Sequence, residues 1–423
     1  MTVTSLDAWL RILEQRHPSA IDMGLERIGV VARALGVTGF DAPVITVGGT
    51  NGKGSTVATL VALARAAGWR VASYTSPHLL RFNERVCLDG EMISDADMVA
   101  ALDAVEAVRG EVSLTYFEHT TLAAFWWFRR QSPDLIVLEV GLGGRLDAGN
   151  LVDASVAVIT SVDLDHQDWL GDTRELIARE KAGILRPGAP VVFGEREPLP
   201  VLTGQAAKLA APQWIKGRDY DFTTDAGTWH WHATTADPAG GPAWRDLPLP
   251  GVSCENAAVA LAALRALAGV SALCIGEDAV RAGLPLAAVP GRAQRLPGSP
   301  EVWLDVGHNP HGARFLWQQL PPARAGQRTH AVFAMLADKD IAGVIAASRA
   351  HVDHWWPAGL EGPRASSGEA MAGHLHAAGI VAEPARAGVA EALMAARQTA
   401  GADDRIVVFG SFLTVAAVLA SGG

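Results

Sequence analysis

The sequence predicts an α/β protein of two domains, each built around a mostly parallel sheet with helices on its faces. Short runs rich in Val and Ile alternate with Ala-rich segments of helical period, the pattern of parallel α/β structure. The chain has 423 residues, and a domain typically holds about 100–200. A stretch rich in Pro and Gly, Pro285–Pro300, separates two series of strands. We therefore predict a first domain over 1–289 and a smaller, Rossmann-like α/β domain over 290–423.

The first domain is predicted from five apolar runs and from the segments between them. Helices are expected at Ser55–Ala67 and at Thr173–Leu185, the second beginning at an Asp172 or Thr173 cap and ending before Pro187. Alternation of period two in Trp214–Trp244, which is rich in Trp, Thr and His, predicts a small antiparallel appendage. The predicted strands are Val44–Val47, Arg70–Tyr74, Leu135–Val140, Val156–Thr160 and Pro190–Phe193.

The second domain repeats the alternation of strands and helices. Its last stretch, Ile406–Gly423, is uncharged and approaches the length of a membrane span. The Gly-Ser pair inside it favours a buried strand, a tight turn and an Ala-rich helix instead, so no membrane association is predicted. The strands expected here are Val302–Val306, Ala331–Leu336, His351–Trp355, Gly379–Val381 and Ile406–Phe409.

Composition restricts the class of protein. Hydrophobic residues make up 49% and charged residues 19%, which excludes a largely disordered chain. Lys and Arg number 35 against 45 Asp and Glu, so the net charge of −10 argues against nucleic-acid binding. Three scattered cysteines, Cys87, Cys254 and Cys274, form neither a disulfide framework nor a zinc motif. With no signal peptide in the amphipathic N-terminal segment, we expect a cytoplasmic protein, and we expect it to be a monomer.

The strongest local signal is the loop GGTNGKGST, Gly48–Thr56, between a predicted strand and a predicted helix. Glycines let successive N–H groups face one point, the helix adds its N-terminal dipole, and Lys53 adds a positive charge. The spacing departs from the standard phosphate loop, because a glycine separates Lys53 from the next hydroxyl. Ser55 or Thr56 could bind Mg²⁺. We predict binding of a nucleoside triphosphate by Thr50, Asn51, Gly52, Lys53, Gly54 and Ser55.

Two polar residues follow later strands. Glu139 ends the apolar run LIVLEV, and His166 lies just beyond the next strand in DLDHQDWLG. A carboxylate that closes a buried strand is costly unless it is paired or bound to a metal. In such folds ligands bind at the carboxyl ends of the strands. From these residues alone, a metal ligand and a salt-bridged strand end both stay open for Glu139. His166 is either a structural histidine or a residue that binds Mg²⁺ or substrate.

A family resemblance rests on seven motifs. GTNGKGS, TSPHLLRFNERV, YFEHTTLAAFWWF, LEVGLGGRLDAGN, DHQDWLG, REKAGI and DVGHNPHG occur in the order found in the folylpolyglutamate synthase/dihydrofolate synthase family. That family belongs to the Mur ligase superfamily of ATP-dependent amide-forming enzymes. The likeness runs from about Ile21 to Thr414. It is most similar to the bifunctional bacterial type, because IDMGLER and TYFE resemble dihydropteroate-binding segments.

The resemblance implies a catalytic centre with two Mg²⁺ ions. The family's metal ligands fall on Ser55, Glu139, His166 and a carbamylated Lys181, and its catalytic residues on Lys53, His166 and Lys181. A carbamate is an anionic oxygen ligand that suits Mg²⁺, whereas an ammonium would be repelled. Without the resemblance, Lys181 would be interpreted as a surface lysine paired with Glu180 or Glu175.

The resemblance also implies where the substrates bind. ATP would contact Asn256, Arg292 and Asp305 in addition to the loop, and would lie between the two domains, which close around it. The glutamate site is the least specified and would use His78, Arg81 and Arg85. The pterin would contact Ile21, Asp22, Met23, Gly24, Thr115, Tyr116, Phe117, Glu118, Leu146, Asp147 and Ala148.

Two of these pterin residues, Asp22 and Glu118, are carboxylates that could accept hydrogen bonds from pterin N–H groups. The alternative for Asp22 is that it caps a helix beginning near Met23.

The implied reaction is ATP-dependent addition of L-glutamate to dihydropteroate and to reduced folates through an acyl phosphate. A monofunctional folylpolyglutamate synthase is the nearest alternative. A peptidoglycan Mur ligase is disfavoured, because residues 1–47 are too few for the UDP-binding domain that usually precedes the loop. A nucleotide-binding switch without catalysis would not need Glu139, His166 and Lys181 together.

Overall fold

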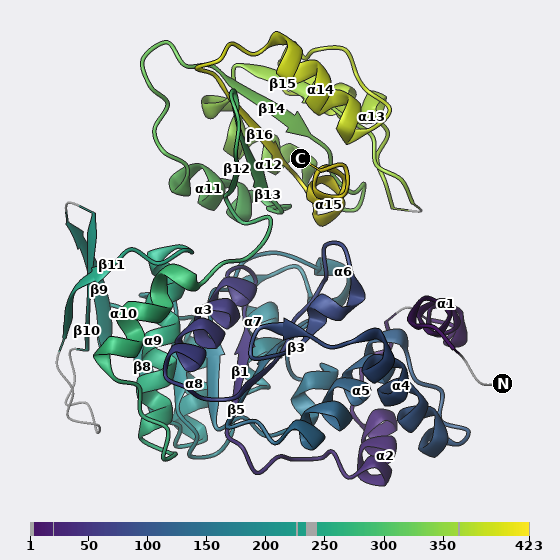
Figure 1. Ribbon diagram of the computed structural model, residues 1–423, viewed down its shortest axis with the longest axis vertical. Coiled ribbons are helices and arrows are strands. Elements are labelled where there is room, and N and C mark those ends of the chain that lie inside the picture. Colours follow the sequence, from purple (N-terminus) through teal and green to yellow (C-terminus); the bar gives the residue numbers. More distant parts are fainter. Residues whose placement is uncertain (1–3, 20, 226, 234–242, 363, 423) are drawn as a thin grey trace. The chain divides into compact units, whose positions relative to one another are not determined.

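The computed structural model describes residues 4–19, 21–225, 227–233, 243–362 and 364–422. The chain divides into two compact units, Met1–Ala288 and Val289–Gly423 (Figure 1). The division falls inside the stretch Pro285–Pro300. Each unit is an α/β structure with its own sheet, and the α/β fold predicted from the sequence is confirmed.

The first unit is built on an eight-stranded sheet of order β4-β3-β2-β5-β1-β6-β7-β8. All five strands predicted in this part of the chain are present and run parallel. Three short strands were not predicted, since runs of two or three residues carry no clear period. The strands are β1 (Val44–Gly48), β2 (Val71–Tyr74), β3 (Val86–Leu88), β4 (Glu91–Met92), β5 (Leu135–Glu139), β6 (Val156–Ile159), β7 (Val191–Phe193) and β8 (Gln213–Ile215).

Helices cover both faces of this sheet. The predicted cap of α7 is confirmed, because the Thr173 side chain accepts a hydrogen bond from the Leu176 N–H. The helices are α1 (Leu6–Arg16), α2 (Glu26–Leu35), α3 (Lys53–Ala66), α4 (Asp95–Arg109), α5 (Tyr116–Gln131), α6 (Gln167–Leu170), α7 (Arg174–Ala182), α8 (Pro200–Lys208), α9 (Cys254–Ala268) and α10 (Glu277–Gly283), with 3₁₀ turns η1 (Phe82–Arg85), η2 (Ala148–Leu151) and η3 (Leu284–Leu286).

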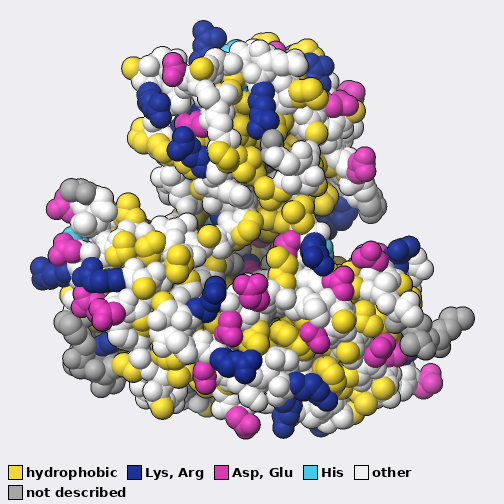
Figure 2. Space-filling view, in the orientation of Figure 1, with side chains coloured by type: hydrophobic (Ala, Val, Ile, Leu, Met, Phe, Trp, Pro, Cys, Tyr) yellow, Lys and Arg dark blue, Asp and Glu magenta, His cyan; other side chains and the backbone are white. Residues whose placement is uncertain are grey.

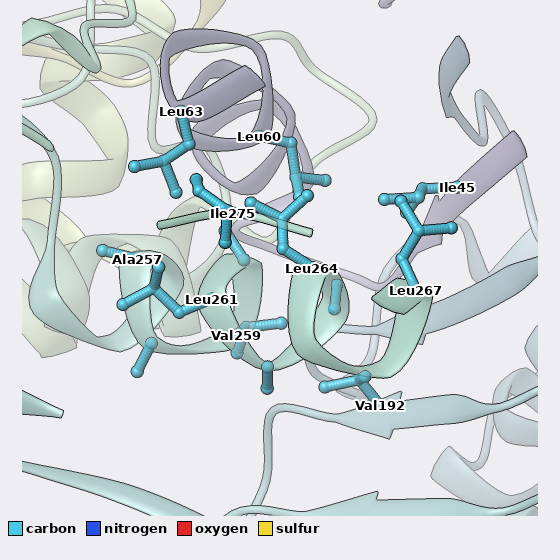
Figure 3. Packing of buried hydrophobic residues seen from close by; sticks show 14 of the residues in the cluster. Ile45, Leu60, Leu63, Val192, Ala257, Val259, Leu261, Leu264, Leu267 and Ile275 are labelled. Atoms are coloured by element: carbon cyan, nitrogen blue, oxygen red, sulfur yellow. The ribbon is translucent and has the colours of Figure 1, made fainter. Parts of the chain in front are cut away.

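Alternate residues of each central strand enter two different cores. In β5, Val137 packs with α3 and α9, whereas Ile136 and Leu138 pack with α1, α2, α4 and α5. Figure 3 shows α9 side chains such as Leu264 and Leu267 lying between α3 and the sheet. Burial on both faces explains why the strand runs are continuously apolar instead of alternating.

The predicted antiparallel appendage is present as β9 (Tyr220–Asp225), β10 (Thr228–Ala233) and β11 (Trp244–Pro248). Its residues 234–242 lie outside the described part of the chain. Trp229 and Trp231 on β10 are buried, and the Trp231 indole N–H donates to the Ala258 carbonyl at 3.2 Å. This contact joins the small sheet to α9.

The second unit holds a five-stranded sheet of order β12-β13-β16-β14-β15, in which β12 alone is antiparallel to its neighbour. The strands are β12 (Gln294–Leu296), β13 (Glu301–Asp305), β14 (Thr329–Phe333), β15 (His354–Pro357) and β16 (Arg405–Phe409). The helices are α11 (Pro310–Gln319), α12 (Ile341–Ser348), α13 (Gly368–Ala377), α14 (Val389–Thr399) and α15 (Phe412–Ala420), with the 3₁₀ turn η4 (Arg349–His351).

One predicted strand, Gly379–Val381, is wrong. Gly379 adopts a φ of 72° and its N–H donates to the His376 carbonyl, while the Ile380 N–H donates to Leu375. These bonds end α13, and Val381 is 98% exposed. A short apolar run beside a helix end resembles a strand in sequence. The strand and helix expected in Ile406–Gly423 are confirmed, and none of the helices in the described residues could cross a membrane.

Candidate active site

The loop after β1 has the form that phosphate binding requires. Gly52 has a φ of 87°, which favours glycine, and α3 begins at the next residue, Lys53. The Lys53 ammonium donates to the carbonyls of Gly49 at 3.0 Å and Thr50 at 3.3 Å. The side chain thus folds back along the loop, at the positive end of the α3 dipole.

The end of β6 holds this loop in place. The Thr50 N–H donates to the Ser161 carbonyl at 2.8 Å, and the Thr160 hydroxyl donates to the Asn51 carbonyl at 2.7 Å. A Cβ on Gly49 would collide with the Thr160 hydroxyl. The loop conformation therefore depends on contacts across the sheet as well as on its glycines.

Of the two hydroxyls that could bind a metal, the structure favours Ser55. The Thr56 hydroxyl is fully buried and donates to the Gly52 carbonyl at 3.0 Å, a bond within α3. Ser55 lies one residue earlier in the first turn of the helix.

Glu139 reaches this same turn. It ends β5, beside Val47 of β1, and is 6% exposed. A Cβ on Gly54 would lie 4.0 Å from both of its carboxylate oxygens. Its Oε2 accepts a hydrogen bond from the Ser76 N–H at 3.0 Å. Sequence reasoning did not single out Ser76, although it stands in the motif TSPHLLRFNERV.

Lys181 is buried, which contradicts the surface interpretation considered from sequence alone. It is 4% exposed, and its neighbour Glu180 pairs with Arg145 at 2.9 Å instead. Burial, followed by the charge of Lys53, lowers the pKa of Lys181 to about 7, while Asp165 and Asp147 act in the opposite direction. A large share of this amine is therefore uncharged near neutral pH.

His166 lies beyond β6, at the residue before α6. Its backbone has a φ of 51°, its side chain is 42% exposed, and its Nε2 lies 4.0 Å from Asp165 Oδ1. Within the described residues, no three His, Cys, Asp or Glu side chains cluster closely enough to hold a metal ion. A metal ion bound near His166 would therefore need at least one ligand that is not an unmodified His, Cys, Asp or Glu side chain.

Asn256, on α9, lies against Gly52 of the phosphate loop. It is 7% exposed, and a Cβ on Gly52 would collide with its Oδ1. Its Nδ2 donor is buried without a hydrogen-bond partner, an arrangement that is costly unless a ligand supplies the acceptor. The neighbouring Glu255 forms an ion pair with Lys216.

The other two predicted ATP residues lie together in the second unit. Asp305 ends β13, is 4% exposed, and accepts hydrogen bonds from the N–H groups of Ala293 at 2.9 Å and Gly307 at 2.6 Å. Burial raises its pKa, and the positive charge of Arg292 opposes that rise. The Arg292 guanidinium lies 5.8 Å from the centre of the Phe412 ring.

Three predicted pterin segments meet at the loop that follows β5. The Phe117 ring fills the space beside Gly141, and the Met23 methyl lies 3.7 Å from where a Cβ on Gly143 would be. Asp147 accepts hydrogen bonds from three N–H groups, including Gly141 at 3.0 Å. Burial raises the pKa of Asp147 to about 6, against these hydrogen bonds and the charge of Lys53.

The two carboxylates expected to meet the pterin are both bound to Arg27. This arginine donates to Asp22 Oδ2 at 2.6 Å and to Glu118 Oε1 at 2.8 Å. Glu118 also accepts the Thr115 N–H in a capping box at the start of α5. The capping alternative for Asp22 is wrong, because α2 begins at Glu26 after Leu25.

The residues considered for glutamate have different interaction partners. The Arg85 Nε donates to His78 Nδ1 at 2.9 Å, and the guanidinium lies over the rings of Phe82 and Tyr116. Burial and the charge of Arg85 lower the pKa of His78 to about 4. Arg81 instead pairs with Asp95 at an exposed position.

The sequence and the fold both match Mur ligases. Residues 47–211 match the Mur ligase middle domain, and residues 291–412 match the Mur ligase glutamate ligase domain. The fold and this site therefore define an ATP-dependent ligase of the Mur ligase type.

Full-length relatives are more specific. The chain is 44% identical over 417 residues to the dihydrofolate synthase/folylpolyglutamate synthase of Escherichia coli, covering 98% of this chain and 94% of that protein. It is 38% identical to the Haemophilus influenzae enzyme of the same name, covering 97% and 96%. The chain belongs to the dihydrofolate synthase/folylpolyglutamate synthase family.

Solved structures agree with this assignment. The structure of E. coli FolC in complex with DHPP and ADP has a TM-score of 0.92 at 43% identity, covering all of this chain and 98% of that one. A bifunctional folylpolyglutamate synthase/dihydrofolate synthase with Mn, AMPPNP and L-glutamate bound has a TM-score of 0.90 at 43% identity, covering 100% and 98%.

Proposed function

We propose that this chain joins L-glutamate to dihydropteroate, and to reduced folates, at the expense of ATP. The observation that carries the proposal is that Lys53 follows β1, while Glu139 ends β5 and the Phe117 and Asp147 side chains lie beside the loop after β5. The chain is also similar over its whole length to bifunctional enzymes. The relatives' structures with DHPP and ADP, and with AMPPNP, Mn and L-glutamate, support the same substrates.

The reaction follows from the charges to be managed. A carboxylate oxygen of the acceptor attacks the γ-phosphorus of ATP, the bond to the bridging oxygen breaks, and ADP leaves. The glutamate amine then attacks the acyl carbon, loses a proton, and the C–O bond to phosphate breaks. Lys53 would neutralise the anionic oxygens in the first step, and the N–H groups of the loop would orient the phosphates.

The described donors fit a hard divalent cation. Glu139 offers a buried carboxylate next to the turn that carries Ser55, and Mg²⁺ prefers such oxygen ligands. We propose that His166 and a carbamylated Lys181 complete the ligands for two Mg²⁺ ions. The metal would supply charge neutralisation at the phosphates. The low pKa of Lys181 supports carbamylation, since only the uncharged amine can attack CO₂.

A monofunctional folylpolyglutamate synthase remains the alternative, because both activities use the same ATP site. Purified protein with ATP, Mg²⁺ and L-glutamate is expected to release ADP when either dihydropteroate or tetrahydrofolate is added. Release with tetrahydrofolate alone would favour the monofunctional enzyme. Release with neither acceptor would contradict the proposed function.

Gly141 lies beside Phe117 and Asp147, two of the residues proposed to contact the pterin, so Gly141→Ala tests the acceptor site. The new Cβ would lie 2.6 Å from Phe117 Cζ and 3.3 Å from Asp147 Oδ2, so the ring must move. We expect the KM for dihydropteroate to rise about tenfold, or ~1.4 kcal/mol, with the KM for ATP within about twofold of the original. Steady-state ADP release measures both constants.

The matched control is Gly204→Ala in α8, where a Cβ would have no atom within 4 Å. It should leave both KM values unchanged. An acceptor KM unaffected by Gly141→Ala would place the pterin away from Phe117.

The charge pattern supports small-molecule substrates over nucleic acid. Over the face drawn in Figure 2, Lys and Arg side chains are interspersed with Asp and Glu, in keeping with the net charge of −10. Phosphate backbones favour continuous basic surfaces. We propose a monomeric, cytoplasmic enzyme that binds neither nucleic acid nor membrane.

A further inference from the structure

Arg27 connects two segments that are distant in sequence. Its Nη1 donates to Asp22 Oδ2 at 2.6 Å, and its Nη2 donates to the Asp22 carbonyl at 3.1 Å and to Glu118 Oε1 at 2.8 Å. Asp22 lies in the segment before α2, and Glu118 lies in the first turn of α5. One guanidinium thereby fixes both the side chain and the backbone of Asp22 relative to α5.

The two segments carry the side chains that border the loop after β5. Phe117 precedes Glu118 and lies against Gly141, whereas Met23 follows Asp22 and lies against Gly143. The separation between these two side chains thus depends on how the segments are joined. Because residues 21–24 belong to no helix or strand, secondary structure does not hold them in place.

Local stability does not explain the arrangement. The residue before α2, Leu25, provides no side-chain cap, and the Arg27 Nε is buried without a hydrogen-bond partner. Both features are unfavourable for folding. Departures of this kind are expected where a site imposes its own geometry.

We propose that Arg27 is a positioning residue for the acceptor substrate: it joins the carboxylates of Asp22 and Glu118 and so holds Met23 opposite Phe117. This inference rests on the proposed function. Asp22 and Glu118 then affect acceptor binding through Arg27, not as hydrogen-bond acceptors for the pterin. The imidazole of His17, whose Nε2 lies 3.5 Å from Asp22 Oδ2, also faces that carboxylate.

The kinetic test compares Arg27→Gln and Arg27→Lys with Arg33→Gln, a control at an exposed position of the same helix. For Arg27→Gln we expect the acceptor KM to rise about tenfold with either dihydropteroate or tetrahydrofolate, while kcat falls less than about threefold and the KM for ATP stays within about twofold. Arg27→Lys keeps the positive charge but loses the planar guanidinium that donates to both carboxylates. Its acceptor KM should therefore lie between those of Arg27→Gln and the unmodified protein.

Three results would overturn the inference. One is an acceptor KM unchanged in Arg27→Gln, and another is a parallel rise in the KM for ATP. The third comes from the double variant Asp22→Asn/Arg27→Gln. Its acceptor KM should match that of Arg27→Gln, whereas a further large rise would show that Asp22 contacts the acceptor directly.

Limited proteolysis tests the positioning role without relying on the activity. Chymotrypsin is expected to cut within residues 21–25 at least about fivefold faster in Arg27→Gln than in the unmodified protein, with Arg33→Gln unchanged. Equal cutting rates would show that Arg27 does not order the segment. If the unmodified protein turned over neither acceptor, the proposed function would fail, and proteolysis would still decide the role of Arg27.

Discussion

Replacing Lys53 by alanine is expected to reduce ADP formation by about 10²–10³-fold or more, because the positive charge of a preorganised phosphate clamp is lost. The Lys53 ammonium donates to the loop carbonyls of Gly49 and Thr50, and Lys53 is not part of a hydrophobic core. The melting temperature should therefore change little. Steady-state ADP release and thermal unfolding measure the two effects.

Lys208→Ala is the matched control, because Lys208 is an exposed lysine in the last turn of α8. It should retain full activity. More than about a tenth of the original turnover in Lys53→Ala would be incompatible with a role at the γ-phosphate.

The second large effect is expected at Lys181. Lys181→Ala should be nearly inactive, and acetate or formate should restore part of the activity by supplying a carboxylate in the vacated space. Removing CO₂ from the buffers should inactivate the unmodified protein, and bicarbonate should reactivate it. With ¹³C-bicarbonate, a carbamate carbon signal should appear in the unmodified protein and in Lys208→Ala, but not in Lys181→Ala.

The pH dependence of this reactivation follows from the pKa of Lys181, which burial lowers to about 7. Below that pH the amine is protonated and does not attack CO₂, so reactivation at a fixed concentration of dissolved CO₂ should slow as the pH falls from 8 to 6. Full activity of CO₂-depleted protein, with no carbamate signal, would refute the role of Lys181 as a metal ligand.

Local sequence was sufficient for much of the first unit. The strands Val44–Gly48 and Leu135–Glu139 are buried on both faces of the sheet. Each is therefore a continuous apolar run in the sequence, which is easily identified as a strand. The phosphate loop is equally local, since its glycines, Lys53 and the following helix are adjacent in the chain. The wrong strand at Gly379–Val381 shows the limit of such reasoning, because the end of α13 has the same short apolar pattern.

The surroundings of the site residues required the tertiary structure. Lys181 lies on a short helix whose sequence looks exposed, and it is buried because the loop after β5 packs across that helix, with Gly144 against the Lys181 backbone. Asn256 reaches Gly52 from a helix about 200 residues further along the chain.

The sequence by itself determined the strands, the phosphate loop and the carboxylate at the end of β5, because each depends on neighbours along the chain. Only the tertiary structure decided that Asp22 and Glu118 share Arg27, across a separation of 91 residues for the Arg27–Glu118 bond. It also decided that the Thr56 hydroxyl is hydrogen-bonded to the Gly52 carbonyl, and that Arg81 pairs with Asp95 whereas Arg85 donates to His78. The physical reason is that hydrogen bonds and burial between distant segments leave no regular spacing in the sequence.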